Sequence, residues 1–188
     1  VPWIIQNCWE YFEYTGDVAF MEEYIYPMLK EEAKFYDATL IEDNEGKLVS
    51  APSYSPEHGP RTAGNTYEQS LVWQLYEDAI TAAQILGVDE DLVEIWSSNQ
   101  ANLKGPIEIG ESGQIKEWYT ETTLNKDANG NNLSGEGYNH RHISHMLGLF
   151  PGDLVQQNPE WIAAAKVSMD NRTDNSTGWG MGQRINTW

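Results

Sequence analysis

The sequence predicts a mainly α-helical fold in which helices form hairpins packed in a ring or a stack. Most apolar residues recur at spacings of three and four, which places them on one face of a helix. Pro and Gly fall where such helices would begin and end. Only one stretch has two short apolar runs around a turn signal. These three features indicate helical hairpins and one small β-hairpin.

In the first third of the chain we expect two helices and the β-hairpin. Asp17 is a suitable N-cap for a short helix that begins at Val18. Pro27 suits the first turn of the next helix, or marks a kink in it. The stripe of this second helix is Leu29, Ala33, Tyr36 and Leu40. Residues 41–49 have the turn signal of the hairpin.

The middle of the chain predicts two further helices and a long loop. The first has the stripe Val72, Leu75, Ala79, Ala82 and Leu86. Gly87 is a natural stop for it. Asp89 is expected to cap the next helix, which runs to about Asn102. Residues 122–137 are rich in Asn and Gly and predict a surface loop.

Three more helices are expected in the last third. One begins near His142 and ends at Pro151. Another has Pro159 in its first turn and runs to about Met169. The last opens near Gly178.

Composition and charge exclude several classes of function. The formal net charge is −18 over 188 residues, so phosphate backbones and anionic lipid would be repelled. Neutral and cationic ligands remain open. Cys8 is the only cysteine, which rules out an internal disulfide. No apolar run reaches the ~18–20 residues needed to cross a bilayer, and no signal peptide is visible.

The ends of the sequence predict that it is a piece of a longer protein. It begins at Val1 rather than Met, and residues 184–188 resemble the middle of a helix. We therefore expect residues 1–188 to be one partial domain, truncated at both ends.

A first candidate site is the loop around Glu57. Pro56 restricts Ser55 to extended backbone, so Glu57 is held on a defined bend. A carboxyl group packed near Tyr54 would lose solvation, its pKa would rise, and it could act as a general acid. The alternative is a Glu that caps the following helix or lies in solvent.

A second candidate site is the run His140-Arg141-His142-Ile143-Ser144-His145. Its side chains predict hydrogen bonding to a polyhydroxylated ligand, because Arg supplies fixed donors and neutral His supplies a donor and an acceptor. The alternatives are a zinc site with three imidazoles and a buried polar network that ties a helix to a loop.

Eight tryptophans favour a sugar as the ligand, because the apolar faces of sugars pack on indole rings. Trp73 and Trp96 lie within helix stripes and are expected in the core. Trp118 and Trp179 adjoin loops and are candidates for a pocket wall.

Four segments together resemble the catalytic domain of glycoside hydrolase family 95, the α-L-fucosidases. They are residues 51–57 (Ala-Pro-Ser-Tyr-Ser-Pro-Glu), 113–118 (Gly-Gln-Ile-Lys-Glu-Trp), 140–152 (His-Arg-His-Ile-Ser-His-Met-Leu-Gly-Leu-Phe-Pro-Gly) and 177–188 (Thr-Gly-Trp-Gly-Met-Gly-Gln-Arg-Ile-Asn-Thr-Trp). The resemblance covers nearly the whole chain, and the segments occur in the family's order.

This resemblance implies part of an (α/α)6 barrel, or toroid, that hydrolyses α-1,2-linked L-fucose with inversion and without a cofactor or metal. Glu57 corresponds to the general acid, and Arg141 and His142 correspond to residues that contact the sugar. The candidate substrate-binding residues are Arg141, His142, His58, Trp118, Asp174 and Trp179.

The sequence also departs from the family pattern. The Gln-Ile-Asp-Gly and Asn-x-Asn segments that activate water in the family are not found in it. An inverting glycosidase needs a second carboxylate about 6.5–9.5 Å from the acid. We therefore expect residues 1–188 alone to be inactive. Gly180 replaces the usual Ser, and Glu68 stands where the family often has Asp.

Two alternative functions are compatible with the same fold. One is an α-L-galactosidase, since one hydroxyl group separates the two sugars. Another is a noncatalytic helical domain that binds carbohydrate or acts as a scaffold. The expected partners are a fucosylated glycan and the rest of the parent chain, without nucleic acid or membrane insertion. The resemblance implies a secreted or cell-surface bacterial protein, although these residues alone leave the location open.

Overall fold

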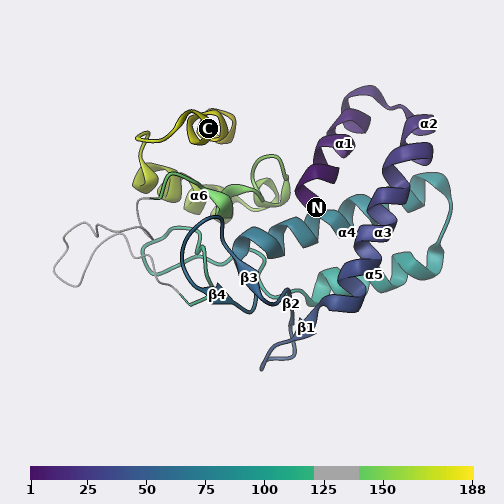
Figure 1. Cartoon of the computed structure of the whole chain (residues 1–188), viewed down its shortest axis with the longest axis horizontal. Coiled ribbons are helices and arrows are strands. Elements are labelled where there is room, and N and C mark those ends of the chain that lie inside the picture. Colours follow the sequence, from purple (N-terminus) through teal and green to yellow (C-terminus); the bar gives the residue numbers. More distant parts are fainter. Residues whose placement is uncertain (121–139) are drawn as a thin grey trace. The chain divides into compact units, whose positions relative to one another are not determined.

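The computed structural model describes residues 1–120 and 140–188. Its chain divides into two compact units (Figure 1). The first unit comprises residues 1–50 and 71–104, and the second comprises residues 51–70 and 105–188. Helix α4 (Thr66–Leu86) contributes its first residues to the second unit and the remainder to the first.

The first unit is built from helices around one apolar core. Besides most of α4 they are α1 (Pro2–Thr15), α2 (Val18–Phe20), the π-helix η1 (Met21–Ile25), α3 (Tyr26–Thr39) and α5 (Glu90–Asn102). The predicted stripes of α3 and α4 face this core, which contains Leu29, Ala33, Val72, Leu75, Ala79 and Ala82. Trp96 is buried in it as expected, and Trp73 packs against it. The mainly α class is therefore confirmed.

The ends of the helices follow the predicted signals in most places. Asp17 caps α2 by accepting a hydrogen bond from the Phe20 amide at 3.0 Å. Gly87 follows α4 with a φ of 69°, a left-handed conformation that glycine adopts without strain. The helix α1 and the second pair of strands, in the second unit, were not predicted.

Asp89 occupies the N-cap position of α5, and α5 ends at Asn102 as predicted, but the Asp89 side chain does not cap the helix. It precedes the helix with a φ of 54°, and its side chain makes no capping hydrogen bond. Its carboxylate instead accepts hydrogen bonds from the Tyr26 hydroxyl at 2.5 Å and from Lys30 Nζ at 2.7 Å. The hydrogen bonds from Lys30 and Tyr26 lower the pKa of Asp89. An ion pair with α3 has therefore replaced the local cap.

Both pairs of strands are short antiparallel hairpins. In the first unit, β1 (Ile41–Glu42) pairs with β2 (Leu48–Val49), which confirms the predicted hairpin. In the second unit, β3 (Ser53–Tyr54) pairs with β4 (Arg61–Thr62). The loop that joins β3 to β4 contains Glu57 and His58.

The predicted helix near His142 is wrong. Residues Ser144–Met146 form one 3-10 turn (η2), and a second turn, η3, covers Leu154–Gln157. The carbonyl oxygen of His142 accepts a hydrogen bond from the Arg172 side chain, so it is not used within a helix. Gly148 and Pro151 also disfavour continuation of the turn.

The last two predicted helices are confirmed. Helix α6 (Pro159–Arg172) starts where Asn158 accepts a hydrogen bond from the Glu160 amide, and it extends past Met169. Helix α7 covers Gly178–Thr187. The predicted loop at 122–137 lies outside the described residues.

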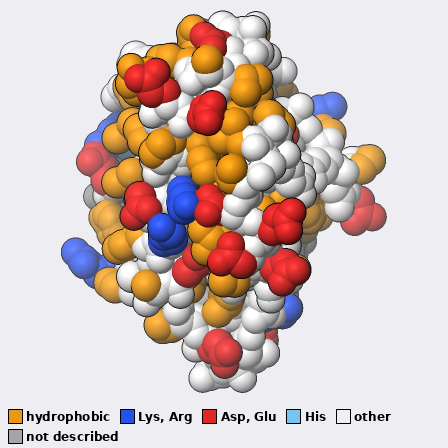
Figure 2. All heavy atoms as spheres, turned by 90° about the vertical axis from the view of Figure 1, so that its right-hand side faces the viewer, with side chains coloured by type: hydrophobic (Ala, Val, Ile, Leu, Met, Phe, Trp, Pro, Cys, Tyr) orange, Lys and Arg blue, Asp and Glu red, His pale blue; other side chains and the backbone are white. Residues whose placement is uncertain are grey.

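Acidic side chains are more frequent than basic ones on the face drawn in Figure 2, in keeping with the net charge of −18. Within the described parts of the chain, no helix is both long and apolar enough to cross a membrane.

Candidate functional site

The β3–β4 loop presents Glu57 at its tip. The amide of His58 donates to the Ser55 carbonyl at 3.0 Å and closes a turn around Glu57. At the base of the loop, the Ser53 hydroxyl donates to Glu68 Oε2 at 2.5 Å. Glu68, the residue that departs from the family pattern, thus ties the loop to α4. The Glu57 side chain is 56% exposed, so the expected packing against aromatic rings is not observed.

The side chains of Arg141 and His142 converge on the carboxylate of Glu57. Arg141 Nη2 forms an ion pair with Glu57 Oε1, and His142 Nε2 lies 4.0 Å from the same oxygen. Partial burial, with the nearby charge of Arg141, lowers the pKa of His142. His142 is therefore neutral at pH 7, with one donor and one acceptor available to a ligand.

Two buried arginines hold the backbone of residues 140–142. Arg172 Nη1 donates to the His142 carbonyl at 2.9 Å, and Arg184 Nη1 donates to the Arg141 carbonyl at 2.8 Å. The Ser176 hydroxyl also donates to the Arg141 carbonyl, at 2.9 Å. Neither arginine was predicted as a site residue, because arginine side chains are usually exposed.

The contacts around the Arg141 carbonyl leave no room for a side chain at position 180, so they require Gly180. A Cβ at position 180 would lie 2.1 Å from Ser176 Oγ and 2.7 Å from the Arg141 carbonyl oxygen. The departure from Ser at this position therefore leaves room for Ser176, whose hydroxyl supplies a hydrogen bond to the same carbonyl.

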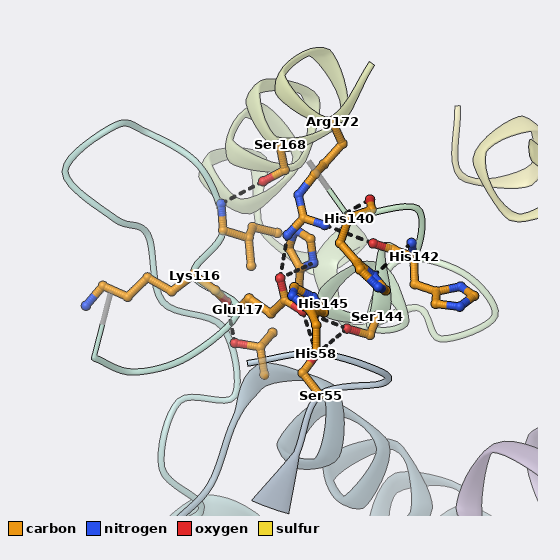
Figure 3. Close-up of polar contacts among 12 residues, drawn as sticks. Ser55, His58, Lys116, Glu117, His140, His142, Ser144, His145, Ser168 and Arg172 are labelled. Carbon is orange, nitrogen blue, oxygen red and sulfur yellow. Dashed lines mark hydrogen bonds and ion pairs between the residues drawn. The ribbon is translucent and has the colours of Figure 1, made fainter. Parts of the chain in front are cut away.

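Glu117 lies in the same unit and is 1% exposed (Figure 3). Its Oε1 accepts hydrogen bonds from Ser55 Oγ at 2.5 Å and Ser144 Oγ at 3.2 Å. His58 Nε2 lies 2.8 Å from the same oxygen and, facing a carboxylate, is the donor. Arg172 Nη2 pairs with Oε2.

The charge state of Glu117 follows from these partners. Burial alone would raise its pKa, but the hydrogen bond from His58 and the charge of Arg172 outweigh burial and lower it. Glu117 is thus a buried anion. Glu117 was not predicted as a site residue, although an acidic residue between Ile115 and Trp118 in a family-like segment was a signal.

His58 and Trp118 lie below the surface. The ring of His58 stacks on His140 with centroids 3.9 Å apart and meets the edge of Trp118 at 5.1 Å. Trp118 is 1% exposed, so it does not form the open pocket wall that its position in the sequence suggested. Among residues 1–120 and 140–188, no group of three or more His, Cys, Asp or Glu side chains could hold a metal ion, so the zinc alternative gains no support.

Asp174 lies on the segment before α7 and Trp179 lies in the first turn of α7; both are exposed, with Trp179 at 67%. Ser176 lies between them and links this segment to the Arg141 carbonyl. A contact of either residue with a sugar stays a prediction.

We expect Gly59→Ala to destabilise the second unit. Gly59 has a φ of +78°, and a Cβ there would lie 2.2 Å from Trp118 Cζ2. Left-handed strain and overpacking together predict a loss of about 2–4 kcal/mol in the free energy of unfolding. Thermal denaturation checks this, with Gly113→Ala as the control: Gly113 has a similar φ of +82° but nothing within 4 Å of its added Cβ. Equal losses in the two variants would contradict the steric part of the argument.

We also expect the second unit to lose stability on mild acidification. Burial, then the charge of Arg172, lowers the pKa of His145 to about 3, and burial with the charge of His58 lowers that of His140 to about 4, both from 6.5. Between pH 6.5 and about 4 the unfolded chain therefore binds protons that the folded chain does not, so stability falls as pH falls. His145→Gln should flatten the slope of melting temperature against pH between 7 and 4.5, and an unchanged slope would contradict this.

The whole chain, residues 1–188, matches the sequence model of the glycosyl hydrolase family 95 catalytic domain. A protein of Aspergillus niger named "Probable alpha-fucosidase A" is 30% identical over 99% of this chain and 24% of its own length. "Alpha-L-fucosidase 2" of Arabidopsis thaliana is 28% identical over 99% of this chain and 22% of its own length. The chain thus spans about a quarter of the length of these relatives. From its first residue to its last, the chain belongs to glycosyl hydrolase family 95.

Proposed function

We propose that the whole protein is an inverting α-L-fucosidase in which Glu57 is the general acid. The observation that carries this proposal is the convergence of Arg141 and His142 on the exposed carboxylate of Glu57. The names of the relatives, which identify them as α-fucosidases, support the choice of sugar. In this proposal Glu57 protonates the leaving glycosidic oxygen of an α-1,2-linked fucoside.

Arg141 and His142 hold the hydroxyl groups of the sugar. The ion pair with Arg141 favours the ionised form of Glu57. In this proposal Arg141 therefore leaves Glu57 to bind a hydroxyl group of the sugar, and Glu57 then takes up the proton that it donates to the leaving oxygen. Asp174 and Trp179 are exposed and are proposed to border the sugar. His58 and Trp118 are buried, and we propose that they act by supporting the Glu57 loop from below.

The carboxylate that activates water is proposed to come from a part of the longer protein outside residues 1–188. These residues then contribute helical hairpins to an (α/α)6 barrel that is completed by the rest of the parent chain. Residues 1–188 alone are expected to release no sugar, because inversion needs both carboxyl groups.

The test uses the full-length protein and an oligosaccharide with a terminal α-1,2-linked L-fucose. NMR of the first turnover should show β-L-fucose, the inverted anomer, and residues 1–188 assayed alone should show no release. Initial release of the α-anomer would contradict inversion. Faster cleavage of the matched α-L-galactoside would indicate that the protein is an α-L-galactosidase. If neither substrate is cleaved, the noncatalytic alternative is favoured.

A further inference from the structure

The carboxylate of Glu117 binds both residues that adjoin the Glu57 bend. Ser55 Oγ and His58 Nε2 approach Glu117 Oε1 at 2.5 and 2.8 Å. Ser55 lies two residues before Glu57, and His58 follows it directly. The backbone that carries Glu57 is therefore fixed on both sides by one buried anion.

The same anion also reaches the segment that carries His142. Arg172 Nη2 pairs with Glu117 Oε2, while Arg172 Nη1 donates to the carbonyl oxygens of His142 at 2.9 Å and His140 at 3.4 Å. Ser144 Oγ adds a hydrogen bond to Glu117 Oε1 at 3.2 Å. In Figure 3 Glu117 lies between Arg172 and the side chains of Ser144 and His58.

The number of donors makes this arrangement rigid. Glu117 Oε2 faces Arg172, while Oε1 faces His58 and the hydroxyl groups of Ser55 and Ser144, which also share a hydrogen bond of 2.6 Å with each other. Arg172 uses its planar fork to join the carboxylate to a backbone carbonyl, which a flexible ammonium could not do with the same geometry. A shift of either segment would leave a buried polar group without its partner.

We propose that Glu117 and Arg172 are positioning residues that hold the Glu57 loop and the His142 segment in the arrangement needed for proton transfer to the leaving group. This inference rests on the proposed function, in which Glu57 is the general acid. It goes further because it assigns the alignment of Glu57 to a buried ion pair that does not itself touch the sugar.

The readout is the dependence of the rate on the leaving group. Departure of a sugar alcohol needs protonation, whereas departure of an activated nitrophenolate needs little, so damage to the general acid slows only the first reaction strongly. The ratio of kcat/KM for an α-1,2-fucosyl oligosaccharide to that for a nitrophenyl α-L-fucoside is measured for each variant. This ratio is independent of the fraction of folded enzyme, so a merely structural loss does not change it.

We expect Glu117→Gln in the full-length protein to lower this ratio about 10–100-fold, because a 1 Å misplacement of a reacting group costs on the order of 10²-fold. Since this variant leaves Arg172 buried without its anion, the double variant Glu117→Gln/Arg172→Met is measured beside it. The double variant has no unpaired charge and should lower the ratio to a similar extent. The matched control is Glu108→Gln, which removes a partly exposed carboxylate that pairs with Lys116 at 3.0 Å, and it should keep the wild-type ratio.

Glu57→Gln separates the inference from the proposed function. If Glu57→Gln lowers the ratio but both Glu117 variants keep the wild-type value, the positioning role is overturned and the function stands. If Glu57→Gln itself keeps the wild-type ratio, or the wild-type protein cleaves neither fucoside, the proposed function fails and the positioning role fails with it.

Discussion

Glu57→Gln is expected to lower kcat/KM of the full-length protein for an α-1,2-fucosyl oligosaccharide by about 10²–10⁴-fold, the usual contribution of a general acid. Glutamine keeps the size of the side chain, and its carbonyl oxygen can still accept a hydrogen bond from Arg141. It has no proton to give to the leaving oxygen. The loss should therefore appear in kcat, with a smaller change in KM.

Steady-state kinetics at neutral pH measure this loss, with Glu108→Gln as the control for removal of a carboxylate in the same unit. The melting temperature of Glu57→Gln should stay close to that of the wild type, because the Glu57 side chain is 56% exposed. A Glu57→Gln enzyme that keeps its rate on the oligosaccharide would remove Glu57 as the acid. The assignment of the chain to glycosyl hydrolase family 95 would stand, because it does not depend on the role of Glu57.

Much of this fold could be predicted because its signals are local. The stripes of α3 and α4 follow helical periodicity, and Pro159 and Gly87 stand at positions where helices begin and end. Glu57 and Arg141 could be selected because polar residues on loops are good site candidates. Their contact joins residues far apart in the chain and became visible only in the folded structure.

The predictions that failed have a common physical cause: polar groups form hydrogen bonds with residues far away in the sequence. Asp89 stands at the N-cap position of α5 as predicted, but its carboxylate binds Tyr26 and Lys30 of α3 and not an amide of the helix. The segment after His142 looked helical, but the His142 carbonyl accepts a hydrogen bond from Arg172. The place of Glu117 between Ile115 and Trp118 was a local signal, but its partners Ser55, Ser144 and Arg172 come from segments far from it in sequence. Where the local sequence pattern predicted the wrong structure, long-range hydrogen bonds therefore determined the observed one.

We expect Arg172→Met to cause the largest loss of stability, because it removes one partner of the long-range ion pair between Arg172 and Glu117. Arg172 is 5% exposed, and its removal would leave the carboxylate of Glu117 buried without a countercharge. Loss of one partner from a buried ion pair costs about 3–5 kcal/mol in the free energy of unfolding. Chemical denaturation of the full-length protein, followed at a probe in the second unit, measures this loss. Lys116→Met removes the partly exposed partner of Glu108 and should cost about 0–1 kcal/mol.

A double variant tests whether the unpaired charge is the cause. Adding Glu117→Gln to Arg172→Met removes the orphaned anion, so the double variant should be more stable than Arg172→Met alone. If the loss arose only from the missing hydrogen bonds to the carbonyls of His140 and His142, the second substitution would not restore stability. A double variant less stable than Arg172→Met would therefore contradict the electrostatic argument. Restored stability together with slow cleavage of the oligosaccharide would indicate that the pair serves the alignment of Glu57 more than the folding of the chain.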